Sequence, residues 1–179
     1  MNQPAAILGG GPSLAEDLKK LPENCLLISV NDHAFHHCEP HVLVYQDHLR
    51  YAPAVADVLE DFAGLVICPW ANSHVKLPRG WWDGNQSSAL ATWYACWMNY
   101  SPVILCGMDC YQGEEMYCHP RPGFDHPIFH VALEHHLERW RMAFDHCPKP
   151  ERIKAMSGPL VQVFGQYEKK EETWLNWLK

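Results

Sequence analysis

Six short runs of apolar residues constrain the fold of this chain more than any other feature. Most of them are continuous rather than alternating, and five of the six end in a polar or glycine-containing turn, whereas the run at residues 65–68 ends at Pro69-Trp70. Continuous apolar runs predict strands that are covered on both faces, which is the pattern of parallel sheets. We expect strands at residues 5–8, 26–30, 42–45, 65–68, 103–106 and 153–156.

Helical patterns separate several of these runs, and this alternation predicts an α/β fold. We expect helices at residues 13–20, 53–62, 87–99 and 130–144. In the first of them, Ser13 followed by Glu16 is typical of a capping box. We predict a single Rossmann-like domain over residues 1–179, with an open, mostly parallel sheet, helices on both faces, and a C-terminal helical tail at residues 166–179.

Composition excludes several classes of protein. The net charge of −7 and the lack of a basic stripe argue against nucleic-acid binding. We expect no membrane span, because no apolar run approaches the roughly 18 residues that it requires. The eight cysteines lie mostly in apolar runs, which favours buried free thiols and a cytoplasmic protein. Clustered tryptophans at residues 70–82 and 174–177 indicate either a homo-oligomer interface or packing on the chain's own core.

Polar residues follow the expected strands where their carboxyl ends would meet at one edge of the sheet. Ligands of open α/β sheets bind at this edge. The residues concerned are Gly9 to Ser13, Asn31 and Asp32, Gln46 and Asp47, and Gly107 to Asp109. We therefore expect one binding site that is assembled from several loops.

The glycine turn at Gly9, Gly10 and Gly11 lets the backbone approach a ligand closely, and the helix after Pro12 and Ser13 would present N–H groups to an anion. The pattern is neither the dinucleotide fingerprint nor a Walker loop. It favours a mononucleotide or a nucleotide-sugar phosphate. The alternative is a structural turn in which the serine only caps the helix.

Six histidines lie between residues 119 and 146. Their spacing matches no recognised zinc pattern, so we predict no metal site. A single histidine acting as a general base fits this region better, because the imidazole pKa lies near neutrality.

Several stretches resemble bacterial CMP-sialic acid-dependent sialyltransferases. They are residues 9–14, Leu21-Pro22, Val30-Asn31, residues 88–112, the tyrosine pair Tyr111 and Tyr117, and residues 153–160. The glycine turn and the Gly-x-Asp strand end are shared with a broader group, the 6-hydroxymethylpterin diphosphokinase (MptE-like) domains, which also occur in phage proteins. The resemblance covers most of the chain as separate islands.

The resemblance implies roles for individual residues. The residues expected to bind the nucleotide are Gly9, Gly10, Gly11, Pro12, Ser13, Asn31, Gln46, Ser87, Ser88 and Asp109. Tyr111 and Tyr117 would donate hydrogen bonds to the leaving phosphate. His130, with His126 as the other candidate, would deprotonate the acceptor hydroxyl.

Three functions remain open at this point. The first is a metal-independent, sialyltransferase-like glycosyltransferase that uses a CMP-sugar and holds no permanent cofactor. The second is an MptE-like diphosphokinase that uses ATP with Mg²⁺ on carboxylates such as Asp47 or Asp109. The third is a phage or prophage protein that binds a nucleotide without turnover.

Overall fold

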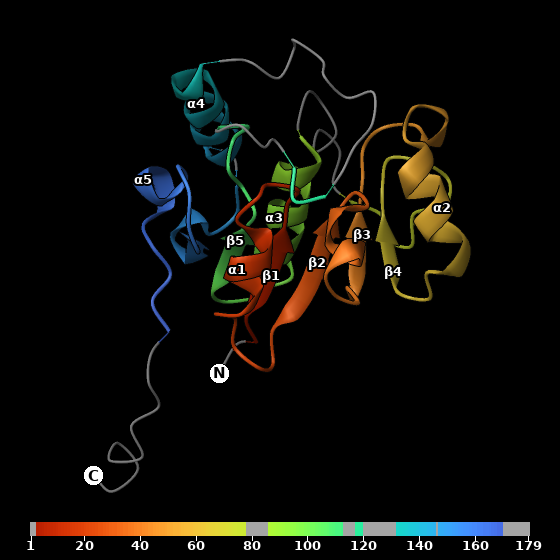
Figure 1. Ribbon diagram of the computed structural model, residues 1–179, viewed down its shortest axis with the longest axis horizontal. Coiled ribbons are helices and arrows are strands. Elements are labelled where there is room, and N and C mark those ends of the chain that lie inside the picture. The colour runs from red at the N-terminus through yellow and green to blue at the C-terminus, as the bar shows by residue number, and fades with distance from the viewer. Residues whose placement is uncertain (1–2, 78–85, 113–116, 120–131, 146, 170–179) are drawn as a thin grey trace, which may run out of the picture.

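The computed structural model describes residues 3–77, 86–112, 117–119, 132–145 and 147–169, and it contains a six-stranded parallel sheet (Figure 1). The strands are β1 (Ala5–Leu8), β2 (Leu26–Val30), β3 (Val42–Val44), β4 (Leu65–Ile67), β5 (Val103–Cys106) and β6 (Ile153–Ala155). Each coincides with a predicted run to within one residue, which confirms the prediction of an open parallel α/β sheet.

The strand order is β4-β3-β2-β1-β5-β6. The chain builds outward from β1 to β4 and then returns to the other side of β1 with β5 and β6. In register, Ile7 of β1 pairs with Ile28 of β2 and with Leu105 of β5. The loops that leave the carboxyl ends of β1 and β5 therefore run in opposite directions, and ligands bind at such a reversal in open α/β sheets.

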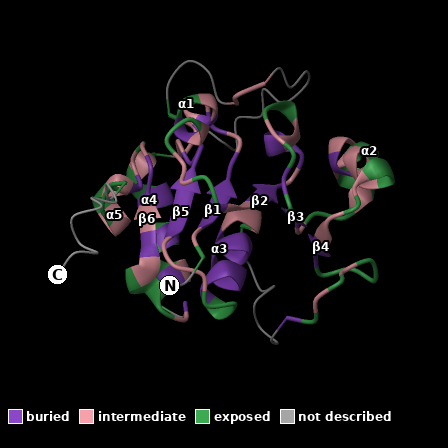
Figure 2. Cartoon of the chain, turned by 90° about the horizontal axis from the view of Figure 1, so that it is seen from below, coloured by how far each residue is buried: buried purple, intermediate pink, exposed green. Residues whose placement is uncertain are grey.

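Helices cover both faces of the sheet, as predicted (Figure 2). On one face α3 (Ser87–Trp97), α4 (Leu133–Phe144) and α5 (Val161–Phe164) share a core with alternate strand residues. On the other face lie α1 (Leu14–Leu18) and α2 (Pro53–Asp61). In β1, Ala5 and Ile7 belong to the first core, whereas Ala6 and Leu8 belong to the core beneath α1. This double coverage explains the continuous apolar runs.

The helix after the glycine turn is shorter than predicted, and the capping-box prediction is wrong. The α1 helix has five residues, and Ser13 makes no side-chain capping hydrogen bond. Its hydroxyl donates instead to Oδ2 of Asp17 over 3.1 Å. Glu16 forms an ion pair with Lys19. Both side chains are thus engaged in other contacts.

The C-terminal part also differs from expectation. Among the described residues the predicted tail is not helical, because Gln166 forms a parallel bridge with Ala155 and the N–H of Tyr167 donates to the Ala155 carbonyl over 2.8 Å. The rest of this predicted helix, residues 170–179, lies outside the described residues. The α4 helix begins at Leu133, and residues 130 and 131 of the predicted helix lie outside the described residues.

All eight cysteines are free, and they are buried or half-buried as the sequence predicted. In the parts of the chain that the structure covers, no helix has the length and apolar character needed to cross a membrane.

Candidate functional site

A cavity of about 350 Å³ opens at the carboxyl ends of the central strands. Its walls come from the loops after β1, β2, β3 and β5, from the start of α3, and from α4. The predicted site residues that line it are Gly9, Gly10, Gly11, Asn31, Gln46, Ser87, Ser88, Asp109, Tyr111 and Tyr117. Pro12 and Ser13 are not among its lining residues. His126 and His130 lie outside the described residues.

The glycine turn packs against the turn that follows β5. The N–H of Gly11 donates to the Gly107 carbonyl over 2.8 Å. A Cβ atom on Gly11 would lie 2.0 Å from Oδ2 of Asp109, and one on Gly10 would lie 2.7 Å from the His33 ring. These approaches, rather than an unusual backbone angle, require glycine at both positions.

The start of α1 is occupied by a side chain of the protein itself. Oδ2 of Asp109 accepts a hydrogen bond from the Ser13 N–H over 3.0 Å. The N–H of Leu14 donates to the Gly11 carbonyl over 3.1 Å. A carboxylate at this position repels a second anion, which makes the start of α1 an unfavourable site for a phosphate.

A buried carboxylate, which the sequence reasoning missed, supports both turns from beneath. Oδ2 of Asp17 accepts hydrogen bonds from the Gly107 N–H over 3.0 Å, from the Ser157 hydroxyl over 2.8 Å and from the Ser13 hydroxyl over 3.1 Å. Asp17 therefore ties α1 to the loops after β5 and β6. The sequence feature that could have identified Asp17 is its position three residues after Leu14, which places an acidic side chain on the face of α1 that packs on the sheet.

Two amide side chains on the opposite wall have buried polar atoms without a partner. Oδ1 of Asn31 and Nε2 of Gln46 make no hydrogen bond to any described residue. The Gln46 backbone is fixed, because its N–H donates to Oγ of Ser87 over 3.1 Å. Buried polar groups are normally paired, so these two atoms indicate a ligand that supplies both a donor and an acceptor.

Aromatic rings form the third wall. Tyr111 and Tyr117 meet edge to face with ring centroids 5.8 Å apart. Tyr117 also stacks on His33, with centroids 5.4 Å apart and ring planes 20° from parallel. Cys110 and Tyr111 both have left-handed backbones, with φ of 53° and 55°. Consecutive non-glycine residues in this region are uncommon and cluster at functional sites.

Sequence reasoning missed four polar residues of the cavity, namely His33, Gln86, His136 and Arg139. His136 and Arg139 belong to α4, and the ring centroid of His136 lies 5.7 Å from that of Tyr111. Arg139 is the only lysine or arginine among the described lining residues. The spacing of three residues, which places both on one side of a helix, was the available signal.

The thiol in the cavity wall is poorly suited to act as a nucleophile. Burial, and to a smaller extent the nearby Asp109 charge, raise the pKa of Cys110 to about 11. Cys110 therefore remains protonated near neutral pH, whereas the reactive form of cysteine is the thiolate.

Comparison with known proteins identifies the fold. No protein-family model and no curated protein matches this chain. Solved structures do match, with a TM-score of 0.64 to the monofunctional alpha-2,3-sialyltransferase Cst-I from Campylobacter jejuni, at 16% identity over 97% of this chain and 83% of that one. The sialyltransferase CstII from the same organism, in complex with the substrate analogue CMP-3FNeuAc, matches with a TM-score of 0.62 at 14% identity. That match covers 97% of this chain and 90% of CstII.

CstII in complex with a trisaccharide acceptor and CMP matches with a TM-score of 0.59 at 14% identity, over 96% of this chain and 89% of that one. The chain therefore has a sialyltransferase-like fold, as its sequence islands indicated. At this level of identity the likeness concerns the fold.

Proposed function

We propose that this chain is a nucleotide-dependent transferase that binds a CMP-type nucleotide, with a CMP-sugar as its donor. The observation that carries the proposal is a pair of buried atoms, Asn31 Oδ1 and Gln46 Nε2, which have no hydrogen-bond partner among the residues that the structure describes and lie in the wall of a cavity that is also lined by two tyrosines. Cytosine and ribose carry both donors and acceptors and would satisfy this pair. The structures of CstII with CMP support the choice of nucleotide, because they share this fold.

The phosphate of the nucleotide would lie toward the aromatic wall. Asp109 already accepts the hydrogen bond of the Ser13 N–H, so the start of α1 is unfavourable for an anion. On the other side Arg139 supplies a positive charge, and Tyr111 and Tyr117 supply phenolic O–H donors. Gly9 to Gly11 would then allow the backbone to approach the ligand closely. Ser87 and Ser88 would lie beside the donor.

The transfer step would need no resident metal ion. The acceptor hydroxyl oxygen attacks the anomeric carbon, the bond from that carbon to the phosphate oxygen breaks, and CMP departs. Hydrogen bonds from Tyr111 and Tyr117 would stabilise the charge that develops on this oxygen. The base that takes the hydroxyl proton is assigned to His130, with His126 as the other candidate.

Nucleotide binding tests the proposal directly. Thermal shift with CMP, CDP, ATP and GTP, each with and without Mg²⁺, should give stabilisation by CMP in the absence of metal. Stabilisation by ATP only when Mg²⁺ is present would overturn the proposal and favour the diphosphokinase. CMP binding without transfer from any CMP-sugar would leave a nucleotide-binding protein.

Matched variants test the site itself. Gln46→Glu removes the Nε2 donor but keeps the shape, and we expect it to weaken CMP binding at least about tenfold, because a hydrogen bond to the ligand is lost and a negative charge enters the cavity. Gln162→Glu, on the exposed surface of α5, makes the same change of charge away from the cavity and should bind CMP normally. Equal affinities for the two variants would exclude Gln46 from the site.

Transfer is tested separately from binding. Tyr117→Phe should lower kcat about a hundredfold, since an oxyanion donor acts most strongly on the transition state, and its effect on CMP affinity should be smaller than its effect on kcat. Tyr51→Phe, on an exposed ring outside the cavity, is the control. His130→Ala should abolish transfer and spare CMP binding; unchanged turnover would remove it as the base and direct attention to His126.

A further inference from the structure

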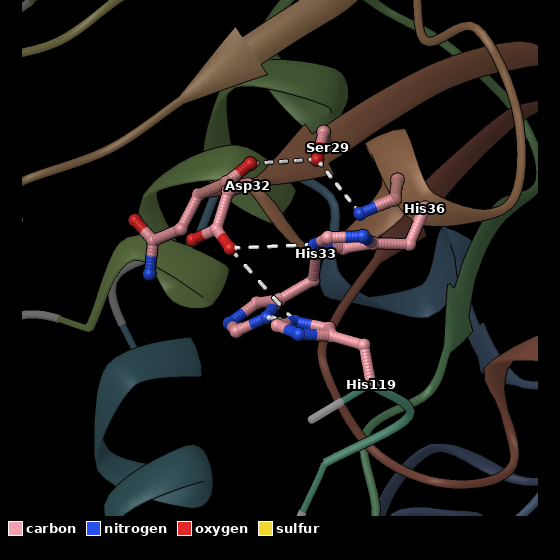
Figure 3. Close-up of polar contacts among 7 residues, drawn as sticks. Ser29, Asp32, His33, His36 and His119 are labelled. Atoms are coloured by element: carbon pink, nitrogen blue, oxygen red, sulfur yellow. Dashed lines mark hydrogen bonds and ion pairs between the residues drawn. The ribbon is translucent and has the colours of Figure 1, made fainter. Parts of the chain in front are cut away.

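A carboxylate and two imidazoles converge beside the cavity (Figure 3). Oδ2 of Asp32 lies 3.8 Å from Nε2 of His36 and 3.8 Å from Nε2 of His119. One ligand atom from each residue lies within 4.8 Å of the other two. These separations are too long for hydrogen bonds. The two distances of 3.8 Å from Asp32 are about half an ångström wider than the spacing of roughly 3.3 Å between ligand atoms around a tetrahedral zinc ion.

The backbone holds these side chains in place from two directions. Asp32 precedes the 3-10 helix η1 (His33–His36), so Asp32 and His36 lie four residues apart on one side of this turn. Oγ of Ser29 donates to the Asn31 carbonyl over 2.7 Å and accepts from the Ala34 N–H over 3.3 Å. Figure 3 shows both contacts. The local geometry is therefore fixed without a metal ion.

His119 arrives from a segment that is far away in the sequence. The preceding residue, Cys118, donates its N–H to the Gly10 carbonyl over 2.8 Å, which anchors this segment to the glycine turn. The side chains of Asp32 and His119 are 3% and 6% exposed, whereas that of His36 is 50% exposed. The cluster is therefore buried on one side and open to solvent on the other.

A proton relay is the other arrangement that histidines and a carboxylate commonly form. A relay passes a proton from one ring nitrogen to the other, so its two partners lie at opposite nitrogens. Here Nε2 of His119 lies 2.9 Å from Nδ1 of His33, and this same Nε2 atom of His119 also faces Asp32. The geometry instead places one ring nitrogen each of His36 and His119 and a carboxylate oxygen of Asp32 within 4.8 Å of one another.

We propose that Asp32, His36 and His119 bind a divalent transition-metal ion, with Zn²⁺ as the best match. Two imidazoles and one carboxylate suit zinc, and three protein ligands leave a fourth position for water on the exposed side of His36. On binding, Nε2 of His119 would turn from His33 to the ion. The sequence did not predict this site, because its ligands come from two distant segments.

The ion would lie behind the wall of the cavity rather than inside it. Asp32, His36 and His119 do not line the cavity, whereas their neighbours His33 and Tyr117 do. The metal would join η1 to the segment at residues 117–119 and so fix Tyr117 in the wall. This is a structural role, and metal binding can be tested independently of the proposed transfer reaction.

Metal titration of the full chain tests the proposal. After treatment with a chelator, the protein should bind one equivalent of Zn²⁺ in calorimetry and gain thermal stability. His36→Ala should weaken binding at least about a hundredfold, because even the loss of outer-shell partners costs 10–100-fold. His36 is half exposed, so this variant should still fold. His37→Ala, at the neighbouring exposed position, is the matched control.

Cobalt substitution separates this site from binding by the free cysteines. Co²⁺ bound by Asp32, His36 and His119 should show d–d bands without the intense charge-transfer band of a thiolate ligand. His119→Gln, with folding checked by near-ultraviolet circular dichroism, should lose these bands. The appearance of a thiolate charge-transfer band would overturn the proposal. So would binding of less than about half an equivalent of Zn²⁺, or equal Zn²⁺ affinity of the His36→Ala and His37→Ala variants.

Discussion

The carboxylate of Asp109 accepts a hydrogen bond from the backbone N–H of Ser13 over 3.0 Å, and this contact joins the turns after β1 and β5. Asp109→Ala leaves that N–H without its acceptor, so we expect the free energy of unfolding to fall by about 1–3 kcal/mol. Asp109→Asn keeps an acceptor oxygen and should cost less. Urea unfolding measures both, and an alanine variant as stable as the parent would show that this contact does not stabilise the turn.

Gly11→Ala tests how tightly these two turns approach. The new Cβ would lie 2.0 Å from Oδ2 of Asp109 and 2.8 Å from the Gly107 carbonyl. We expect a loss of about 1–3 kcal/mol in the free energy of unfolding, the usual cost of overpacking. The added cost should shrink in an Asp109→Ala background but not vanish, because the carbonyl remains. Additive losses in this double-mutant cycle would contradict the close approach.

Arg139→Gln should weaken nucleotide binding, because Arg139 is the cation that faces the cavity from α4. A hydrogen bond to a charged group contributes about 1.5–3 kcal/mol, which corresponds to a loss of affinity of about tenfold or more. The effect should be strong for CMP and weak for cytidine, which has no phosphate. Arg141→Gln, on an exposed position of the same helix outside the cavity, is the control in calorimetry.

Gln46→Met should separate stability from binding. The side chains are similar in length, and the substitution removes the buried Nε2 donor that makes no hydrogen bond to described residues. We expect the free energy of unfolding to rise by about 1 kcal/mol in the absence of ligand, while CMP affinity falls. A variant that is less stable than the parent would show that this donor is satisfied in the free protein.

Stability should fall in alkaline solution through the buried thiols. Burial raises the pKa of Cys25 from its ordinary value of 9.0 to about 12. The unfolded chain therefore releases this proton at lower pH than the folded chain, and the folded state loses stability as pH rises from 9 toward 12. Urea unfolding between about pH 8 and pH 10 measures the slope. Cys25→Ala should make it shallower; an unchanged slope would exclude Cys25 as a contributor.

The sheet was predictable because its signal is local. A strand such as residues 103–106 needs to be apolar on both sides wherever it lies in a parallel sheet, and the chain shows this directly. The meeting of Asn31, Gln46 and Asp109 in one cavity was predictable for the same reason, since it depends only on where parallel strands end.

The contacts that the sequence did not predict are those between segments with no local pattern. The Ser13 N–H is paired with a carboxylate 96 positions away, so the turn resembled an open anion site. Arg139 and His136 belong to the helix predicted at residues 130–144, and only the packing of this helix on the sheet brings them to the cavity. His119 joins Asp32 through the anchor at Gly10. Such pairings are properties of the assembled chain.

The consecutive left-handed residues Cys110 and Tyr111 bear on how this protein responds to selection. Each costs about 1–2 kcal/mol relative to glycine at the same backbone angles. A library screened only for heat resistance should therefore enrich glycine at both positions. The same library screened for turnover should retain tyrosine at 111 while still admitting glycine at 110. Comparison of the two enrichment profiles at each position would show where the chain loses thermal stability in order to keep an aromatic ring in the cavity wall.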